Sequence, residues 1–219
     1  MINVSAKTIE GAVYKAYLEL YTSKAVVSDP SILKEDSAVI IITNEVQPTA
    51  YFKIVNGNLV YTFDHASFVP SVKQVKLKDE EKYWTQVLLK TNAKDKIVAH
   101  LRKNMNSRRT LLDLWKDEYF YNTNQGGACI TQLYFRKKGE GIELHTHARA
   151  NDAHRCLLMD LHMMSTMHVW VAKDLGLNIG QYIHFVDALH FYKKYEQDIH
   201  EQVRLFNTLY RWKKYRESD

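Results

Sequence analysis

Residues 128–176 read ACITQLYFRKKGEGIELHTHARANDAHRCLLMDLHMMSTMHVWVAKDLG, and they hold the clearest signals of the fold. Two apolar stretches, 128–137 and 142–149, flank the turn Lys138-Gly139-Glu140-Gly141, so they are expected to pair as antiparallel strands. Residues 153–175 then follow the spacing of a long helix. Gly176 is suited to end that helix in the left-handed conformation that glycine tolerates. The segment predicts two strands and a helix of one fold.

The rest of the chain mixes helices and strands without strict alternation. From Met1 to Leu20 the chain reads as an amphipathic helix, with clear helical spacing from residue 7. The Asn56-Gly57 dipeptide predicts a β-hairpin. Further strands are expected at 38–43, 51–55, 59–63, 110–115 and 181–186. Further helices are expected at 78–90, 93–104 and 191–215. This order predicts an α+β fold with one mostly buried sheet, in a single domain over residues 1–219.

The composition excludes several classes of protein. Hydrophobic residues make up 46% and charged residues 25%, which is typical of a globular protein and not of a disordered one. No apolar run approaches the ~20 residues that span a bilayer, and the start is too polar for a signal peptide. We therefore expect a cytoplasmic location, in the producing cell or, for a viral protein, in its host. Cys129 and Cys156 are too few for a disulfide scaffold or a cysteine zinc site.

Asp160 is the most unusual residue of the helix expected at 153–175. It shares a face with Cys156, Leu157, Met163, Met164 and Met167. Burying an unpaired carboxylate costs several kcal/mol, so this group must be paired, protonated or solvated by a cleft. A structural salt bridge to Arg149 or Arg155 satisfies that condition, and so does a carboxyl group that faces a ligand.

Three other features are candidates for chemistry. Cys129 follows two glycines at the start of an expected strand, where nearby arginines would lower its pKa, although most such cysteines only pack. The paired Arg108 and Arg109 suit phosphate oxygens, but a solvated basic turn has the same pattern. His145 and His147 point to one face of a strand. No third ligand has convincing spacing, so no metal site is expected.

Together these segments resemble the thymidylate synthases and their nucleotide hydroxymethylase relatives, over about residues 93–195. The matching positions are the paired-arginine segment Asn106-Ser107-Arg108-Arg109 with Trp115, Cys129 at the nucleophile, Arg149 twenty residues later, Asp152, Asp160 at the position that reads the pyrimidine, and the pair His190 and Tyr192. The resemblance implies a thymidylate synthase-like fold, a homodimer and the cofactor 5,10-methylenetetrahydrofolate. It implies no membrane partner and no direct binding of nucleic acid.

The resemblance also implies a role for each matching residue. The Cys129 thiolate would add to C6 of a pyrimidine nucleotide and make C5 nucleophilic. Arg149 would bind the phosphate and lower the pKa of the thiol, while Arg108 and Arg109 would reach the phosphate site of the partner subunit. The remaining implied roles are a cofactor contact for Asp152, hydrogen bonds from His190 and Tyr192 to the sugar hydroxyl, and proton removal from C5 assisted by Tyr83.

Asp160 indicates the base. Thymidylate synthases have asparagine at this position, and its amide accepts from uracil N3–H and donates to O4. Cytosine presents the opposite pattern, which a protonated carboxyl group matches. Relatives with aspartate here are cytidylate hydroxymethylases, so the resemblance implies a dCMP or CMP 5-hydroxymethylase. A cytidylate methylase, a divergent thymidylate synthase and a non-catalytic nucleotide-binding member remain open alternatives.

Several positions depart from the family pattern: Ala128, Ile130, Tyr134, Ala150 and Cys156 stand where the family has proline, histidine, glutamine, serine and glycine. The family's catalytic glutamate has no secure counterpart, with Glu35 and Glu45 as candidates. The C-terminus also lacks the usual apolar closing tail. These departures are the reason for keeping a non-catalytic alternative.

Overall fold

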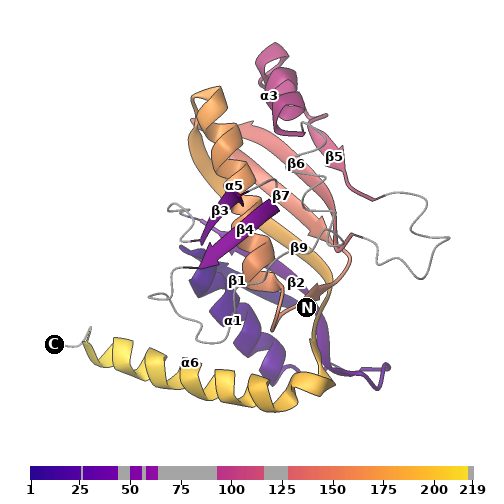
Figure 1. Cartoon of the computed structure of the whole chain (residues 1–219), viewed down its shortest axis with the longest axis vertical. Helices are drawn as coiled ribbons and strands as arrows, with labels where there is room; N and C mark the ends of the chain where they lie inside the picture. The colour runs from indigo at the N-terminus through magenta and orange to yellow at the C-terminus, as the bar shows by residue number, and fades with distance from the viewer. Residues whose placement is uncertain (26, 44–49, 56–57, 64–92, 116–127, 217–219) are drawn as a thin grey trace.

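The computed structural model describes residues 1–25, 27–43, 50–55, 58–63, 93–115 and 128–216 (Figure 1). The helix expected at 78–90, the turn at Asn56-Gly57, Tyr83 and Glu45 lie outside these ranges. The strands expected at 51–55 and 59–63 are present as an antiparallel pair, β3 (Ala50–Val55) and β4 (Asn58–Phe63).

A seven-stranded mixed sheet forms the centre of the molecule, as the α+β prediction required. Its main path is β1-β2-β9-β7-β6-β5, and β8 pairs with β9 beside it. β1 and β2 are parallel, as are β7 and β9, whereas β2–β9, β6–β7 and β5–β6 are antiparallel. The strand bounds are β1 Ile2–Ala6, β2 Ile32–Ile42, β5 Leu111–Asp113, β6 Ile130–Lys138, β7 Gly141–Ala148, β8 Asn151–Asp152 and β9 Asn178–Tyr192.

The described helices are α1 (Ile9–Thr22), α3 (Ala93–Lys103), α5 (Leu157–Leu175) and α6 (Glu196–Arg216), the last preceded by the short 3₁₀ helix η2 (Lys193–Tyr195). Of these, α1 and α5 lie across one face of the sheet (Figure 1). α1 packs on β1 and β2, α5 packs on β7 and β9, and the two helices also contact each other. None of the described helices is long and apolar enough to cross a membrane.

The N-terminus corrects one prediction. Residues 2–6 form strand β1 and are not part of an amphipathic helix, because Ile2 and Val4 alternate with exposed residues and fill the sheet beside β2. The helix begins only after Thr8, whose hydroxyl accepts a hydrogen bond from the Gly11 N–H (3.1 Å).

The long helix also begins later than the expected residue 153. Asp152 Oδ1 accepts from the N–H groups of His154 and Arg155, at 2.9 and 3.1 Å, and holds residues 153–156 in a turn. α5 therefore starts at Leu157, and it ends at Gly176, which has the predicted left-handed conformation (φ 68°). At the other end of the chain, Phe191 and Tyr192 belong to β9 and not to the last helix as expected.

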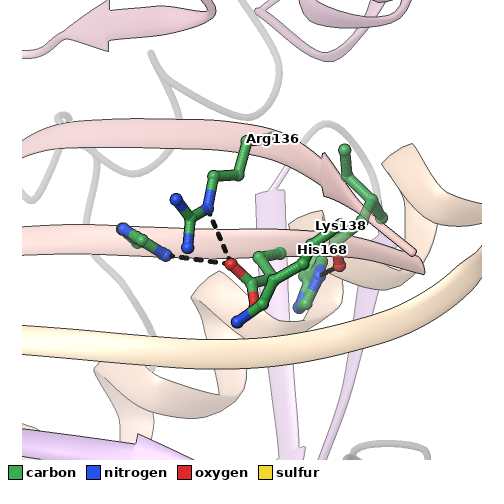
Figure 2. A network of polar contacts seen from close by, with 6 residues as sticks. Arg136, Lys138 and His168 are labelled. Atoms are coloured by element: carbon green, nitrogen blue, oxygen red, sulfur yellow. Dashed lines mark hydrogen bonds and ion pairs between the residues drawn. The ribbon is translucent and has the colours of Figure 1, made fainter. Parts of the chain in front are cut away.

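The hairpin β6–β7 is tied together and to α5 by polar contacts (Figure 2). The buried Glu143 receives Arg136 Nε at 2.7 Å and Lys138 Nζ at 3.0 Å, with His145 Nε2 at 3.5 Å. His168 on α5 lies 2.6 Å from the carbonyl oxygen of Ile142, across the helix–sheet interface. These contacts hold the turn end of the hairpin together and attach it to the C-terminal half of α5.

The opposite face of the sheet carries two cross-strand rows of side chains. The first row is Leu111, Tyr134, His145, Ile183 and Ile41, each opposite the next. The second is Asp113, Gln132, His147, Phe185 and Val39. All of these residues are half-buried or exposed, and Leu111 and Phe185 are among the most exposed large apolar side chains of the described chain. We call this surface the open sheet face.

Candidate active site

Cys129 and Arg149 lie together where β6 begins and β7 ends. The Arg149 N–H donates to the Cys129 carbonyl oxygen (2.9 Å), which holds the two strand ends side by side. The Arg149 guanidinium donates through Nε to the Ala128 carbonyl (3.0 Å) and lies 5.6 Å from the centre of the Trp115 ring. The cation is thereby held beside the backbone that carries the thiol.

Asp160 lies in the first turn of α5 and is only 3% exposed. Its Oδ2 accepts from Asn151 Nδ2 (3.0 Å). Neither candidate salt-bridge partner contacts it, since Arg155 donates to the Tyr195 hydroxyl (2.9 Å) and Arg149 to Ala128. The salt bridge considered from the sequence is therefore wrong. Burial raises the pKa of Asp160 to about 8, with a further rise from Asp152 and an opposing effect of the Asn151 hydrogen bond. The carboxyl group is mostly protonated at neutral pH.

The Cys129 thiol lies within electrostatic range of Asp160, Asp152 and Arg149. Burial is the largest cause that raises its pKa, and the carboxylate of Asp160 adds to the rise. Arg149 lowers the pKa, as the resemblance implied, but the other effects outweigh it. The expected low pKa of this thiol is therefore wrong for the isolated subunit. The predicted proximity of Cys129, Arg149 and Asp160 is present.

The end of β9 brings two further predicted residues to this region. The rings of His190 and Tyr192 meet edge to face, with centres 4.7 Å apart. Burial raises the pKa of Tyr192, and the charges of Asp152 and then of Cys129 raise it further, which places its hydroxyl near both. His190 Nδ1 contacts the Ala188 carbonyl (3.0 Å), whereas its buried Nε2 has no hydrogen-bond partner within the described ranges. That nitrogen is ready to accept a hydrogen bond from a ligand.

Asp152 and Cys156 also border the cluster. One carboxylate oxygen of Asp152 is occupied by the turn before α5, which leaves the other oxygen for a ligand. Burial is the largest cause that raises the pKa of Cys156 far above its ordinary value, and Asp160 and Asp152 add to the rise. The Cys156 thiol therefore borders the site in its neutral form and is a poor nucleophile.

Arg108 and Arg109 are not part of this cluster in one chain. Both are exposed in the loop between α3 and β5, where they border a cleft of about 580 Å³. The neighbouring Thr110 lies beside Phe135, six residues along from Cys129. At ~3.3 Å per strand residue the separation is roughly 20 Å. Within one chain, the two arginines therefore lie far from this thiol.

The structure also shows polar residues that the sequence did not single out. Asn151, His184, Thr146 and Tyr182 form a buried hydrogen-bonded chain behind Asp160. His184 and Tyr182 alternate with exposed residues on β9 and so point to the helix side. The sequence shows this alternation but not the contact of His184 with Asn151, because that contact joins residues 33 positions apart. Within the described part of the chain, no group of three or more His, Cys, Asp or Glu residues is arranged to hold a metal ion.

A model of the thymidylate synthase family matches residues 61–208, more than half of the chain. The chain belongs to the thymidylate synthase family. The thymidylate synthase of Streptococcus pyogenes serotype M5 (strain Manfredo) is 29% identical over 110 residues, which are 48% of this chain and 39% of that protein. The thymidylate synthase of Streptococcus mutans serotype c is 25% identical over 122 residues, 54% of this chain and 44% of its own.

Among solved structures, the thermostable thymidylate synthase A from Bacillus subtilis aligns with a TM-score of 0.45 and 21% identity, over 49% of this chain and 38% of that one. The chain thus spans less than half the length of the curated relatives it matches. The family uses methylenetetrahydrofolate as its one-carbon donor and acts at C5 of pyrimidine nucleotides.

Proposed function

We propose that this member of the family is a (deoxy)cytidylate 5-hydroxymethylase, which uses methylenetetrahydrofolate to modify dCMP or CMP. The observation that carries the proposal is the buried carboxyl group of Asp160, which has no cation beside it among the described residues and lies in the same cluster as the Cys129 thiol. Such a group is a proton donor and an acceptor at once near neutral pH.

This pair of functions matches cytosine. The base presents N3 as an acceptor and the 4-amino group as a donor. A protonated Asp160 donates to N3 and accepts from the amine, whereas uracil leaves groups unpaired at a cost of about 1–3 kcal/mol each. The same proton also relieves negative charge that develops in the ring when a nucleophile adds to C6.

The other residues of the cluster have complementary tasks in this proposal. Cys129 adds to C6, which makes C5 a nucleophile, and Arg149 binds the phosphate. His190 and Tyr192 hydrogen-bond the sugar hydroxyl, for which His190 Nε2, without a partner among the described residues, is a suitable acceptor. Tyr83 assists proton removal from C5. When bound, the folate supplies the one-carbon unit, and the oxygen of Asp152 that the turn leaves open suits the N–H donors of its pteridine ring.

The proposed enzyme is a homodimer. The two rows of the open sheet face give it a partly apolar surface that none of the described helices covers, which suits a second copy of the chain. A dimer also explains why Arg108 and Arg109 lie about 20 Å from Cys129 along the strand, since each pair would complete the phosphate site of the partner.

One observation favours a second candidate, a nucleotide-binding protein without turnover. The raised pKa of Cys129, caused first by burial, leaves little thiolate at neutral pH in the isolated subunit. In the proposed enzyme, the partner's arginines and the bound substrate lower the pKa of Cys129 enough to form the thiolate. In a binding protein without turnover, the pKa of Cys129 stays raised when the nucleotide is bound.

Release of tritium from 5-tritiated dCMP and dUMP, in the presence of methylenetetrahydrofolate, tests the proposal. We expect release from dCMP, a gain of CH₂O in the product by mass spectrometry, and none of either with Cys129→Ala, which still binds nucleotide. A gain of CH₂ would identify a methylase.

Asp160→Asn should move the preference toward dUMP by tenfold or more, on the order of the penalty for mismatched hydrogen bonds. An unchanged preference, or a wild type that acts only on dUMP, would refute the assignment to cytosine.

A further inference from the structure

A chain of buried polar side chains runs from Asp160 into the core. Asn151 Nδ2 lies 3.0 Å from Asp160 Oδ2 and 3.4 Å from His184 Nε2. His184 Nδ1 lies 2.6 Å from the Thr146 hydroxyl, which is 3.2 Å from the hydroxyl of Tyr182. The members of this chain are between 0 and 3% exposed, so water does not compete for their hydrogen bonds.

The protons of this chain can be placed. An amide nitrogen only donates, so His184 Nε2 must accept from Asn151, and Nδ1 carries the ring proton and donates to Thr146. A neutral imidazole is required, and burial lowers the pKa of His184 to about 3, with a further decrease from the charge of His147. The His184 ring is therefore fixed in one tautomer across the pH range in which enzymes work.

Two contacts of one nitrogen hold the Asn151 amide in place. Its Nδ2 donates to Asp160 and to His184, whereas its buried Oδ1 has no hydrogen-bond partner among the residues that the structure describes. Without the acceptor nitrogen of His184, the observed orientation of the Asn151 amide would lose one of its two hydrogen bonds. His184 thus acts on Asp160 through Asn151.

The amide orientation decides which oxygen of Asp160 carries the proton. Oδ2 accepts from Asn151, and the carbonyl-type oxygen of a carboxylic acid is the better acceptor, so the proton belongs on Oδ1. A flipped amide would present its oxygen instead and draw the proton to Oδ2. In the first arrangement Asp160 offers a ligand a donor at Oδ1, which is what N3 of cytosine needs.

We propose that Asn151 and His184 are positioning residues that fix the Asp160 proton on Oδ1 and thereby set the preference for cytosine over uracil. The selectivity part of this inference rests on the proposed function, whereas the position of the proton does not. Charged and titratable groups from other segments also face Asp160: Asp152 on β8, Cys129 before β6 and Cys156 before α5. None of these groups is a member of the hydrogen-bonded series formed by the side chains of Asn151, His184, Thr146 and Tyr182, so they are the same in all variants below.

The test compares Asn151→Ala, His184→Phe and His184→Gln. Phenylalanine keeps the ring but loses the acceptor, whereas glutamine can accept from Asn151 and donate to Thr146. We expect the ratio of kcat/KM for dCMP to that for dUMP to fall about tenfold in Asn151→Ala and His184→Phe, and to return to within roughly threefold in His184→Gln. His168→Phe, which removes a buried histidine outside this chain, should leave the ratio unchanged. Equal ratios in His184→Phe and His184→Gln would overturn the inference.

A second measurement does not depend on activity. The carboxyl titration of Asp160, followed by ¹³C NMR and assigned by its loss in Asp160→Asn, should move to higher pH in Asn151→Ala, because that hydrogen bond stabilises the ionised form. An unchanged midpoint would overturn the positioning role, and Asn151→Ser replaces Asn151→Ala if the latter does not fold. A wild type without activity on dCMP would refute the proposed function and the selectivity role together, while the titration still decides the positioning role.

Discussion

At the scale of single residues, the site depends on two groups whose pKa values move upward for the same reason. Burial favours the neutral forms of the Asp160 carboxyl and of the Cys129 thiol. For Asp160 the neutral form is the useful one in the proposed reaction. For Cys129 it is the resting form, and the cation of Arg149 is the group that opposes it.

The reactivity of Cys129 should therefore rise steeply with pH. Alkylation by iodoacetamide, followed in a Cys156→Ser background, should still be accelerating at about pH 9. Arg149→Gln should slow it several-fold at any lower pH, because one pKa unit changes the thiolate fraction about tenfold. A rate that levels off below about pH 8, near the pKa of an ordinary thiol, would contradict the raised pKa.

Asp160 should also make stability depend on pH. In the unfolded chain it ionises near pH 4, but in the folded protein it stays protonated until about pH 8. Unfolding then releases a proton between these values, so this group lowers the free energy of unfolding as pH rises, by up to ~1.4 kcal/mol per pH unit. Above about pH 8 its contribution is constant.

Urea denaturation of the wild type and of Asp160→Asn at a series of pH values measures this effect. The difference in unfolding free energy should grow in favour of Asp160→Asn from about pH 5 to about pH 8 and then level off. Two parallel curves would show that the carboxyl group is ionised in the folded protein at neutral pH.

At the scale of elements, β9 pairs with β7 at His184 and with β8 at His190, and these pairings bring both histidines to the site. A Cβ added at Gly180 would lie 2.7 Å from the carbonyl oxygen of Ile142, which is backbone and cannot move away alone. Gly139, in the β6–β7 turn, has a positive φ (58°) but open space around its Cα. The two glycines are thus needed for different reasons.

Gly180→Ala should lower the free energy of unfolding by about 1–3 kcal/mol and also reduce activity, because β9 must shift against β7. Gly139→Asn should cost less than ~1 kcal/mol and leave activity unchanged, since asparagine tolerates the left-handed region. Thermal unfolding and tritium release measure the two effects. Full activity in Gly180→Ala would show that the register of β9 does not control the site.

At the scale of the whole molecule, the open sheet face should decide whether the site is complete. Phe185→Glu places a charge in the middle of one cross-strand row. We expect a monomer that binds nucleotide weakly, because Arg108 and Arg109 then no longer reach the thiol of a partner. Leu205→Glu, which changes an exposed leucine on α6, is the matched control. Analytical ultracentrifugation checks both variants, and a dimeric Phe185→Glu would place the interface elsewhere.

The sequence by itself determined the α+β class, the hairpin before α5, the end of that helix at Gly176 and the family, because these depend on local periodicity, turn residues and a string of spacings. It missed β1, since five residues of alternation are too short to outweigh the helix pattern beside them. Only the tertiary structure showed that Asp160 has no cation beside it in the described part of the chain, that the Cys129 pKa is raised and that Asn151 contacts both the carboxyl group and His184. Charge and hydrogen bonding inside a protein depend on burial and on which distant residues meet, and these are properties of the packed chain.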